Sequence, residues 1–128
     1  MKFGYTIIYV PEVAAALDFY ERAFGLTRRF LHESGTYGEL ETGSTALAFA
    51  SEDQGESNGV SFRCIRPQEA APGIEIALVT AQVEEAFTRA VNAGAEPVKK
   101  AEQKPWGQTV AYVRDLNGVL VELCTPMG

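Results

Sequence analysis

The chain has 128 residues, the usual size of one domain, and 46% of them are hydrophobic, so a normal core can be buried. Eleven Lys and Arg residues against seventeen Asp and Glu residues give a net charge of -6. This charge disfavours nucleic acid as a partner, because phosphate binding needs a basic surface, and it mildly favours cationic ligands. No apolar run is long enough to span a bilayer, and the N-terminus lacks the pattern of a signal peptide, so we expect no membrane partner.

The two cysteines, Cys64 and Cys124, form no metal-binding or redox spacing. The sequence alone leaves a disulfide between them open. Because there is no export signal, we expect two reduced thiols in a cytoplasmic protein.

The first half of the chain is predicted to form a strand, a helix and three further strands. Residues 3–10 are rich in aromatic and β-branched side chains, which is typical of a strand. Pro11 is tolerated in the first turn of a helix, apolar residues recur at helical spacing as far as Phe24, and Gly25 ends the helix. Strands are then predicted over 27–33, 37–42 and 45–50, with glycines at the turns.

The second half repeats this pattern after a connection. The polar, glycine-rich stretch 51–59 predicts a loop, residues 60–65 have strand character, and residues 66–73 contain two prolines and predict another connection. A strand over 74–80 precedes a helix whose apolar face begins at Val83 and which Gly94 closes. Strands follow over 96–100, 108–114 and 119–125.

The order strand, helix and three strands therefore occurs twice. Aligning the two helices places Tyr5 on Glu75, and downstream Tyr37 corresponds to Trp106 and Gly43 to Gly118. One such unit buries only one face of its sheet, whereas two together can form a shared concave surface. We predict a single α+β domain over 1–128, with module 1 at 1–51, a linker at 52–73 and module 2 at 74–128.

Four stretches carry a resemblance to a known family. Residues 10–21 (VPEVAAALDFYE) and 23–26 (AFGL) resemble the opening of glyoxalase-like chains. Residues 104–108 (KPWGQ) and 115–123 (DLNGVLVEL) are similar to the most recognisable stretch of the vicinal oxygen chelate superfamily, which contains glyoxalases, bleomycin resistance proteins and dioxygenases. The resemblance covers nearly the whole chain and implies two βαβββ modules that form a cup-shaped mixed sheet.

In the metal-dependent members of that superfamily, four strand positions hold a divalent cation that binds two neighbouring oxygens of the substrate. The resemblance lays these positions on Tyr5, Leu47, Glu75 and Glu122. Only the two glutamates are ordinary ligands, and the single histidine, His32, lies elsewhere, so we expect no metal cofactor. If both glutamates face one cavity, the repulsion between their like charges raises the pKa of one of them. A shared proton or a bound cation would relieve this repulsion.

The aromatic residues point to a ligand instead. Pro-Trp-Gly-Gln at 105–108, followed by Arg-Asp-x-x-Gly at 114–118, is similar to the bleomycin resistance proteins. In those proteins one aromatic side chain from each module clamps the flat part of the drug, and the resemblance lays Trp106 and Tyr37 on these two places. Stacking contributes about 0.5–1.5 kcal/mol per ring pair beyond burial, and a cationic ligand adds cation–π attraction. The alternative is that Trp106 packs under a loop as a core residue.

We therefore predict a metal-free binding protein that holds an aromatic or cationic, antibiotic-like small molecule without turning it over, and the resemblance implies a homodimer. The alternative is a metal-dependent lyase, isomerase or dioxygenase of the glyoxalase type, with Glu75 and Glu122 as ligands of a divalent metal ion. A third possibility is an interaction module with no small ligand. The predicted ligand-binding residues are Trp106, Tyr37, Tyr5, Phe49, Glu75 and Glu122.

Overall fold

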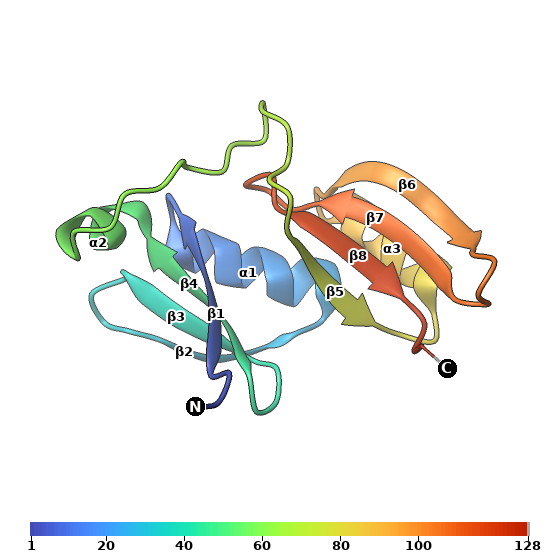
Figure 1. Cartoon of the computed structure of the whole chain (residues 1–128), viewed down its shortest axis with the longest axis horizontal. Helices are drawn as coiled ribbons and strands as arrows, with labels where there is room; N and C mark the ends of the chain where they lie inside the picture. Colours follow the sequence, from blue (N-terminus) through green and yellow to red (C-terminus); the bar gives the residue numbers. More distant parts are fainter. Residues whose placement is uncertain (128) are drawn as a thin grey trace. The chain divides into compact units, whose positions relative to one another are not determined.

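The computed structural model describes residues 1–127 as two compact units, which divide between Cys64 and Ile65. The division falls inside the predicted linker 52–73. Each unit contains a four-stranded mixed sheet and one long helix (Figure 1). The predicted α+β fold of two βαβββ modules is confirmed. Within residues 1–127, no helix is long and apolar enough to cross a membrane.

Unit 1 has the strand order β1-β4-β3-β2, with β1 parallel to β4 and the other neighbours antiparallel. Its long helix begins at Val13, with Pro11 and the N-cap Glu12 before it. It is followed by Gly25, whose φ of 69° is left-handed and suits glycine. The elements of unit 1 are β1 (Tyr5–Val10), α1 (Val13–Phe24), β2 (Thr27–Leu31), β3 (Tyr37–Glu41), β4 (Ala46–Ser51) and the short α2 (Glu52–Ser57).

The pairing of β1 with β4 decides which side chains meet α1. Ile8 lies opposite Phe49, and the Phe49 ring packs against Tyr20 of α1 with the ring centroids 5.1 Å apart. Because successive side chains of a strand point to opposite faces, Tyr5 and its partner Ala46 lie on the face away from α1. We call this the open face of unit 1.

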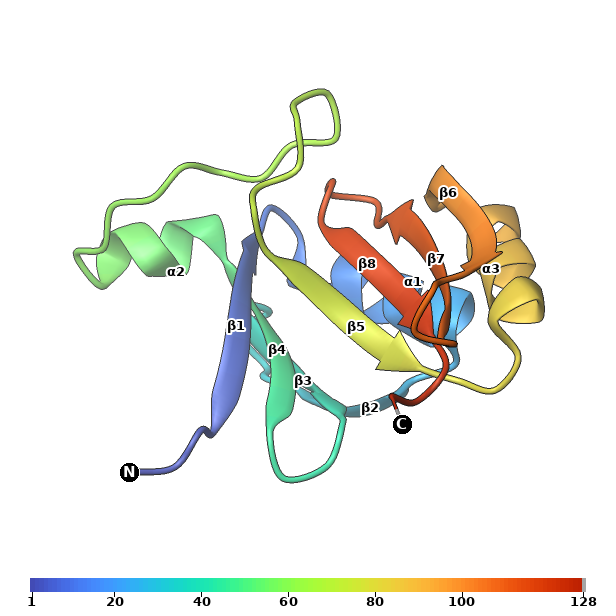
Figure 2. The ribbon, with the colours of Figure 1, turned by 45° about the vertical axis from the view of Figure 1, so that its right-hand side comes forward.

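Unit 2 repeats the arrangement with the order β5-β8-β7-β6, in which β5 is parallel to β8. The helix α3 packs against β6, β7 and β8, and Val113, Val121 and Leu123 are buried in this core (Figure 2). The face away from α3 is the open face of unit 2. The elements are β5 (Glu75–Val79), α3 (Val83–Asn92), β6 (Glu96–Gln103), β7 (Thr109–Arg114) and β8 (Leu120–Cys124).

The segment between the modules differs from the prediction. Residues 52–57, expected in a loop, form α2, because the Ser51 side chain accepts a hydrogen bond from the Gln54 N–H at 3.1 Å and so caps the helix. Residues 60–65, expected as a strand, form none. Their apolar side chains serve packing instead: the Phe62 ring stacks on Tyr9 with a centroid distance of 4.4 Å, beside the buried Gly55.

The strand registers correct two correspondences between the modules. Tyr5 lies opposite Ala46, and its counterpart Glu75 lies opposite Leu120, so Glu122 corresponds to Ala48 and not to Leu47. Leu47 points toward α1, since a shift of one residue changes the face of the sheet.

Trp106 does not correspond to Tyr37. Tyr37 lies opposite Ala50 on β3, and the equivalent residue of unit 2 is Val110, which lies opposite Cys124. Trp106 lies in the turn before β7. Gly43 and Gly118 do share a role, because both have positive φ (96° and 98°) in the hairpin that precedes the last strand of their module.

Candidate ligand-binding groove

A groove of about 930 Å³ opens on the open face of unit 2. Apolar side chains of β5 and of the C-terminal segment form much of its wall, and the Glu122 carboxylate and the Gln108 amide are polar groups within it. A mostly apolar wall with a few placed polar groups is typical of a small-molecule site. Its lining residues are Ala77, Val79, Trp106, Gly107, Gln108, Glu122, Cys124, Thr125, Pro126 and Met127.

The indole of Trp106 stands at this groove and is not part of the core. The residue is 65% exposed, which removes the alternative that it packs under a loop. A tight turn presents it: the Gly107 N–H donates to the Lys104 carbonyl at 2.8 Å, and Gly107 has a φ of 95°. A large aromatic ring held in solvent beside an apolar groove has a face free for stacking.

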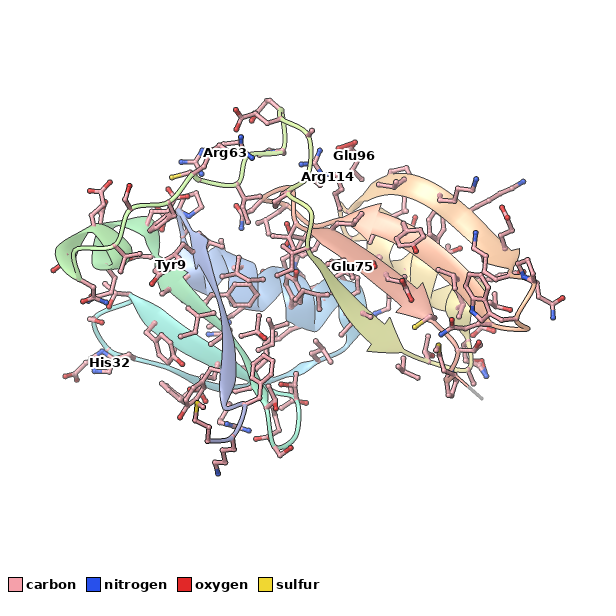
Figure 3. The ribbon with its side chains drawn as sticks, viewed as in Figure 1. Tyr9, His32, Arg63, Glu75, Glu96 and Arg114 are labelled. Atoms are coloured by element: carbon pink, nitrogen blue, oxygen red, sulfur yellow. The ribbon has the colours of Figure 1, made fainter. Side chains whose placement is uncertain are left out.

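Two carboxyl groups meet on the same face. Glu75 on β5 and Glu122 on β8 both point away from α3, since Glu75 lies opposite Leu120 and Glu122 lies opposite Ala77 (Figure 3 labels Glu75). Burial raises the pKa of Glu75, and the negative charge of Glu122 and a hydrogen bond with it raise this pKa further. These are the causes expected for two like charges on one face of a sheet, and a cation bound nearby would relieve their repulsion.

Tyr112 and Cys124 extend this cluster with neutral groups. The Tyr112 hydroxyl donates to Glu122 Oε1 at 3.2 Å, and burial, followed by the charge of Glu122, raises the pKa of Tyr112. Burial also raises the pKa of the Cys124 thiol to about 11, with a further contribution from Glu122. A thiol that stays protonated at neutral pH is a poor nucleophile, so Cys124 is a structural residue. Within residues 1–127, Cys64 and Cys124 are not joined by a disulfide.

Tyr5 and Tyr37 lie together on the open face of unit 1. Tyr5 is 58% exposed, while Tyr37 is half-buried and donates its hydroxyl to Glu39 Oε2 at 2.8 Å. Glu39 is itself buried and also accepts from Arg29 Nη1 at 3.0 Å. Burial, followed by the hydrogen bond to Glu39, raises the pKa of Tyr37. Its phenol is therefore neutral and fixed in orientation.

Phe49 lies neither at the groove of unit 2 nor on the open face of unit 1. It lies on the α1 side of its sheet and is fully buried against Tyr20, so its ring presents no surface to a ligand. We leave it out of the candidate site. The structure thus places Trp106 and Glu122 at one groove of unit 2, with Glu75 beside Glu122 but outside the groove lining. Tyr5 and Tyr37 share the open face of unit 1, opposite the two ends of β4.

Several groove residues were absent from the predicted site. Val79 shares a face with Glu75, and Cys124 shares one with Glu122, because each lies an even number of residues along its strand. That alternation was readable in the sequence. The roles of Gln108 and of Tyr112 depend on hydrogen bonds that only the folded chain defines.

Several basic side chains outside the groove have partners within the protein. Arg28 bonds to Glu21 and Arg29 to Glu39 and Glu41. Arg114, labelled in Figure 3, donates to the main-chain carbonyls of Gly118, Pro67 and Arg66. His32 lies after β2 and its Nδ1 is 2.8 Å from the Ser34 hydroxyl. None of these side chains lines the groove.

The residues do not fit the metal centre implied by the resemblance. The register places Ala48 at the position first laid on Leu47, and neither side chain has a metal-binding atom. Among residues 1–127 there is no group of three or more His, Cys, Asp or Glu side chains that could hold a metal ion. Unit 2 offers two carboxylates, which is too few for the borderline metals of this chemistry.

Two βαβββ modules, each with a helix on one face of its sheet, define the class of fold. The sequence profile of the Glyoxalase/Bleomycin resistance protein/Dioxygenase superfamily matches residues 2–123. The chain belongs to this superfamily. A search of the curated proteins gives no match.

Solved structures show the same fold. A glyoxalase-related enzyme from Fulvimarina pelagi superimposes with a TM-score of 0.82 at 21% identity, over 98% of this chain and 88% of that one. TioX from Micromonospora sp. ML1 gives a TM-score of 0.74 at 22% identity, over 98% of both chains. A superfamily member from Sphaerobacter thermophilus gives 0.72 at 22% identity, again over 98% of both. At these identities the likeness establishes the fold alone.

Proposed function

We propose that this chain is a metal-free binding protein that sequesters a planar aromatic ligand carrying positive charge, in the groove of unit 2. One observation carries the proposal: the only tryptophan of the chain is 65% exposed at the edge of a groove that also contains the Glu122 carboxylate.

The chemistry of the groove selects this ligand class. An indole face attracts flat rings by stacking and attracts cations through its quadrupole. Glu122, with Glu75 beside it, offers negative charge to the same ligand, and a positive group near them would relieve the repulsion between the two carboxylates. The net charge of -6 also speeds the approach of cations.

Tyr5 and Tyr37 support a role for unit 1 in the same function. Their phenols lie on the open face of that unit, and the Tyr37 ring is fixed by Glu39. A ring with a fixed orientation loses little side-chain entropy when a ligand contacts it. We propose that both tyrosines contribute to ligand binding.

The remaining proposals concern partners and location. We propose a homodimer, because unit 1 exposes the apolar side chains of Tyr5 and Ile7 on its edge strand β1, and of Phe3 just before it. We propose a cytoplasmic protein, and two cysteines that are not joined by a disulfide are compatible with a reducing compartment. No step of the proposed function needs a metal, and stoichiometric metal in protein purified without chelator would contradict it.

Calorimetry with three flat probes of different charge tests the ligand class. At pH 7.5 and low salt we expect 1-methylquinolinium to bind more tightly than neutral quinoline, and naphthalene-2-sulfonate to bind most weakly. Trp106→Ala should weaken quinolinium binding about tenfold or more, since stacking and burial of one ring together exceed ~1.4 kcal/mol.

Val98→Ala is the matched control, because Val98 is an exposed apolar residue of β6 outside the groove lining. It should leave the affinity unchanged. Equal binding of all three probes, or equal affinity of the wild type and Trp106→Ala, would contradict the proposal.

A further inference from the structure

Gln108 joins two walls of the groove through one buried amide. The residue is 8% exposed. Its Oε1 accepts a hydrogen bond from the indole Nε1 of Trp106 at 2.8 Å, and its Nε2 donates to the Thr125 carbonyl at 2.8 Å. Trp106 and Thr125 both line the groove.

The chemistry of these two partners requires an amide at position 108. An indole N–H can only donate and a carbonyl oxygen can only accept, so the residue between them must offer one acceptor and one donor. Glutamine does so in one orientation. Methionine has the same length but forms neither bond, and an ionised glutamate would face the Thr125 carbonyl without a proton.

Main-chain hydrogen bonds around Gln108 hold this residue in place. The Lys104 N–H donates to the Gln108 carbonyl at 2.7 Å, which closes the turn that carries Trp106. On the next residue, the Thr109 N–H donates to Thr125 Oγ1 at 3.0 Å, and the Thr125 N–H donates to the Thr109 carbonyl at 3.0 Å. Both ends of the Gln108 bridge are therefore attached to the β7–β8 ladder.

We propose that Gln108 is a positioning residue, which holds the exposed indole of Trp106 against the C-terminal wall of the groove so that its face is oriented before a ligand arrives. The effect on affinity rests on the proposed function, whereas the fixed orientation of the indole does not. A side chain that is ordered before binding avoids the entropy cost of becoming immobilised on the ligand. This saving raises the affinity about two- to tenfold.

The orientation is tested in the ligand-free full-length protein, where the only tryptophan reports on one site. Time-resolved fluorescence anisotropy should show little fast motion of the indole in the wild type and a larger fast component in Gln108→Met. Hydrogen exchange of the indole Nε1–H should be slower than that of free tryptophan, despite the 65% exposure of the residue. This second readout needs no variant, so it decides the matter if Gln108→Met does not fold. Indole motion equal in both proteins, or unprotected exchange, would overturn the proposal.

A double-mutant cycle with 1-methylquinolinium tests the effect on binding. Gln108→Met should weaken binding by about two- to tenfold in the wild type. In the Trp106→Phe background, which lacks the indole N–H, the same substitution should change the affinity by less than about twofold, because contacting groups couple and unconnected ones do not. Equal losses in both backgrounds would show that Gln108 does not act through Trp106. If the wild type binds no probe, the proposed function fails, and the anisotropy and exchange measurements still decide the role of Gln108.

Discussion

Glu75 and Glu122 show how two neighbouring side chains give the groove its electrostatic character. Each would be an ordinary surface glutamate alone, but on adjacent parallel strands their carboxyl groups meet, and the pKa of Glu75 rises through burial and through Glu122. Tyr112 and Cys124 face the same pair, and their raised pKa values keep both neutral at physiological pH.

The raised pKa of Glu75 predicts a pH-dependent stability. Folded Glu75 holds its proton more tightly than the unfolded chain does, so its stabilising contribution is present below the ordinary value of 4.5 and is lost as the pH rises through the raised value. The Glu75→Gln variant has no carboxyl group to ionise at this position, so it does not lose stability in this way as the pH rises. We expect its free energy of unfolding in urea at pH 7.5 to exceed that of the wild type by roughly 0.2–1 kcal/mol, the range for exposed charges. The difference should shrink toward pH 4.

Glu96→Gln is the matched control, since Glu96 is an exposed glutamate at the start of β6 (Figure 3). It should show no such pH-dependent difference. A Glu75→Gln variant that is less stable than the wild type at pH 7.5, or a difference independent of pH, would mean that the two carboxyl groups are not coupled.

At the level of single residues, the sequence predicted part of the site. The resemblance to the superfamily pointed to Glu75, Glu122 and Trp106. It did so at positions with clear local signals, since the two strands have clear limits and the turn is marked by Pro105 and Gly107. Leu47 and Phe49 were placed on the wrong face. The strand that contains them is buried on both faces, so its sequence, Ala-Leu-Ala-Phe-Ala, has no polar side to show which residues point toward the helix.

At the level of elements, helices and strands with clear end signals were predictable. Pro11 and Gly25 bound α1 because one residue suits a helix start and the other the left-handed conformation beyond its end. Residues 52–65 were harder. A six-residue helix depends on its Ser51 cap more than on an apolar repeat, and the apolar residues after it pack as single side chains, as Phe62 does on Tyr9.

The edge strand β1 is the element that favours a homodimer. Within its sheet β1 has a neighbour on one side only. Tyr5 and Ile7 on this strand are 58% and 44% exposed, and Phe3, just before it, is 70% exposed. We expect sedimentation velocity to show a dimer for the wild type and a shift toward monomer for Ile7→Lys, because a charge placed in an apolar interface is costly to bury.

Val60→Lys is the control for this experiment, since Val60 is a 48% exposed apolar residue of the connecting segment. It should leave the sedimentation unchanged. A monomeric wild type at micromolar concentration would contradict the homodimer.

At the level of the whole molecule, the duplicated fold contains two different open faces. In unit 1 the face carries Tyr5, Tyr37 and the alanines of β4, whereas in unit 2 it carries Glu75, Glu122 and the groove beside Trp106. Repetition of βαβββ was visible in the sequence because it depends on helix periodicity and turn glycines. The sequence did not show which side chains each open face carries, because that depends on the register of the strands.

The central claim is that the groove beside Trp106 holds a flat cation, and the fluorescence of this single tryptophan tests it most directly. Titration with 1-methylquinolinium should quench the emission to a plateau while the lifetime of the remaining emission stays constant, as expected for a complex in which the probe stacks on the indole. Collision without binding would instead give quenching that rises linearly with probe concentration and equals the quenching of free tryptophan, together with a shortened lifetime. This result would contradict the claim.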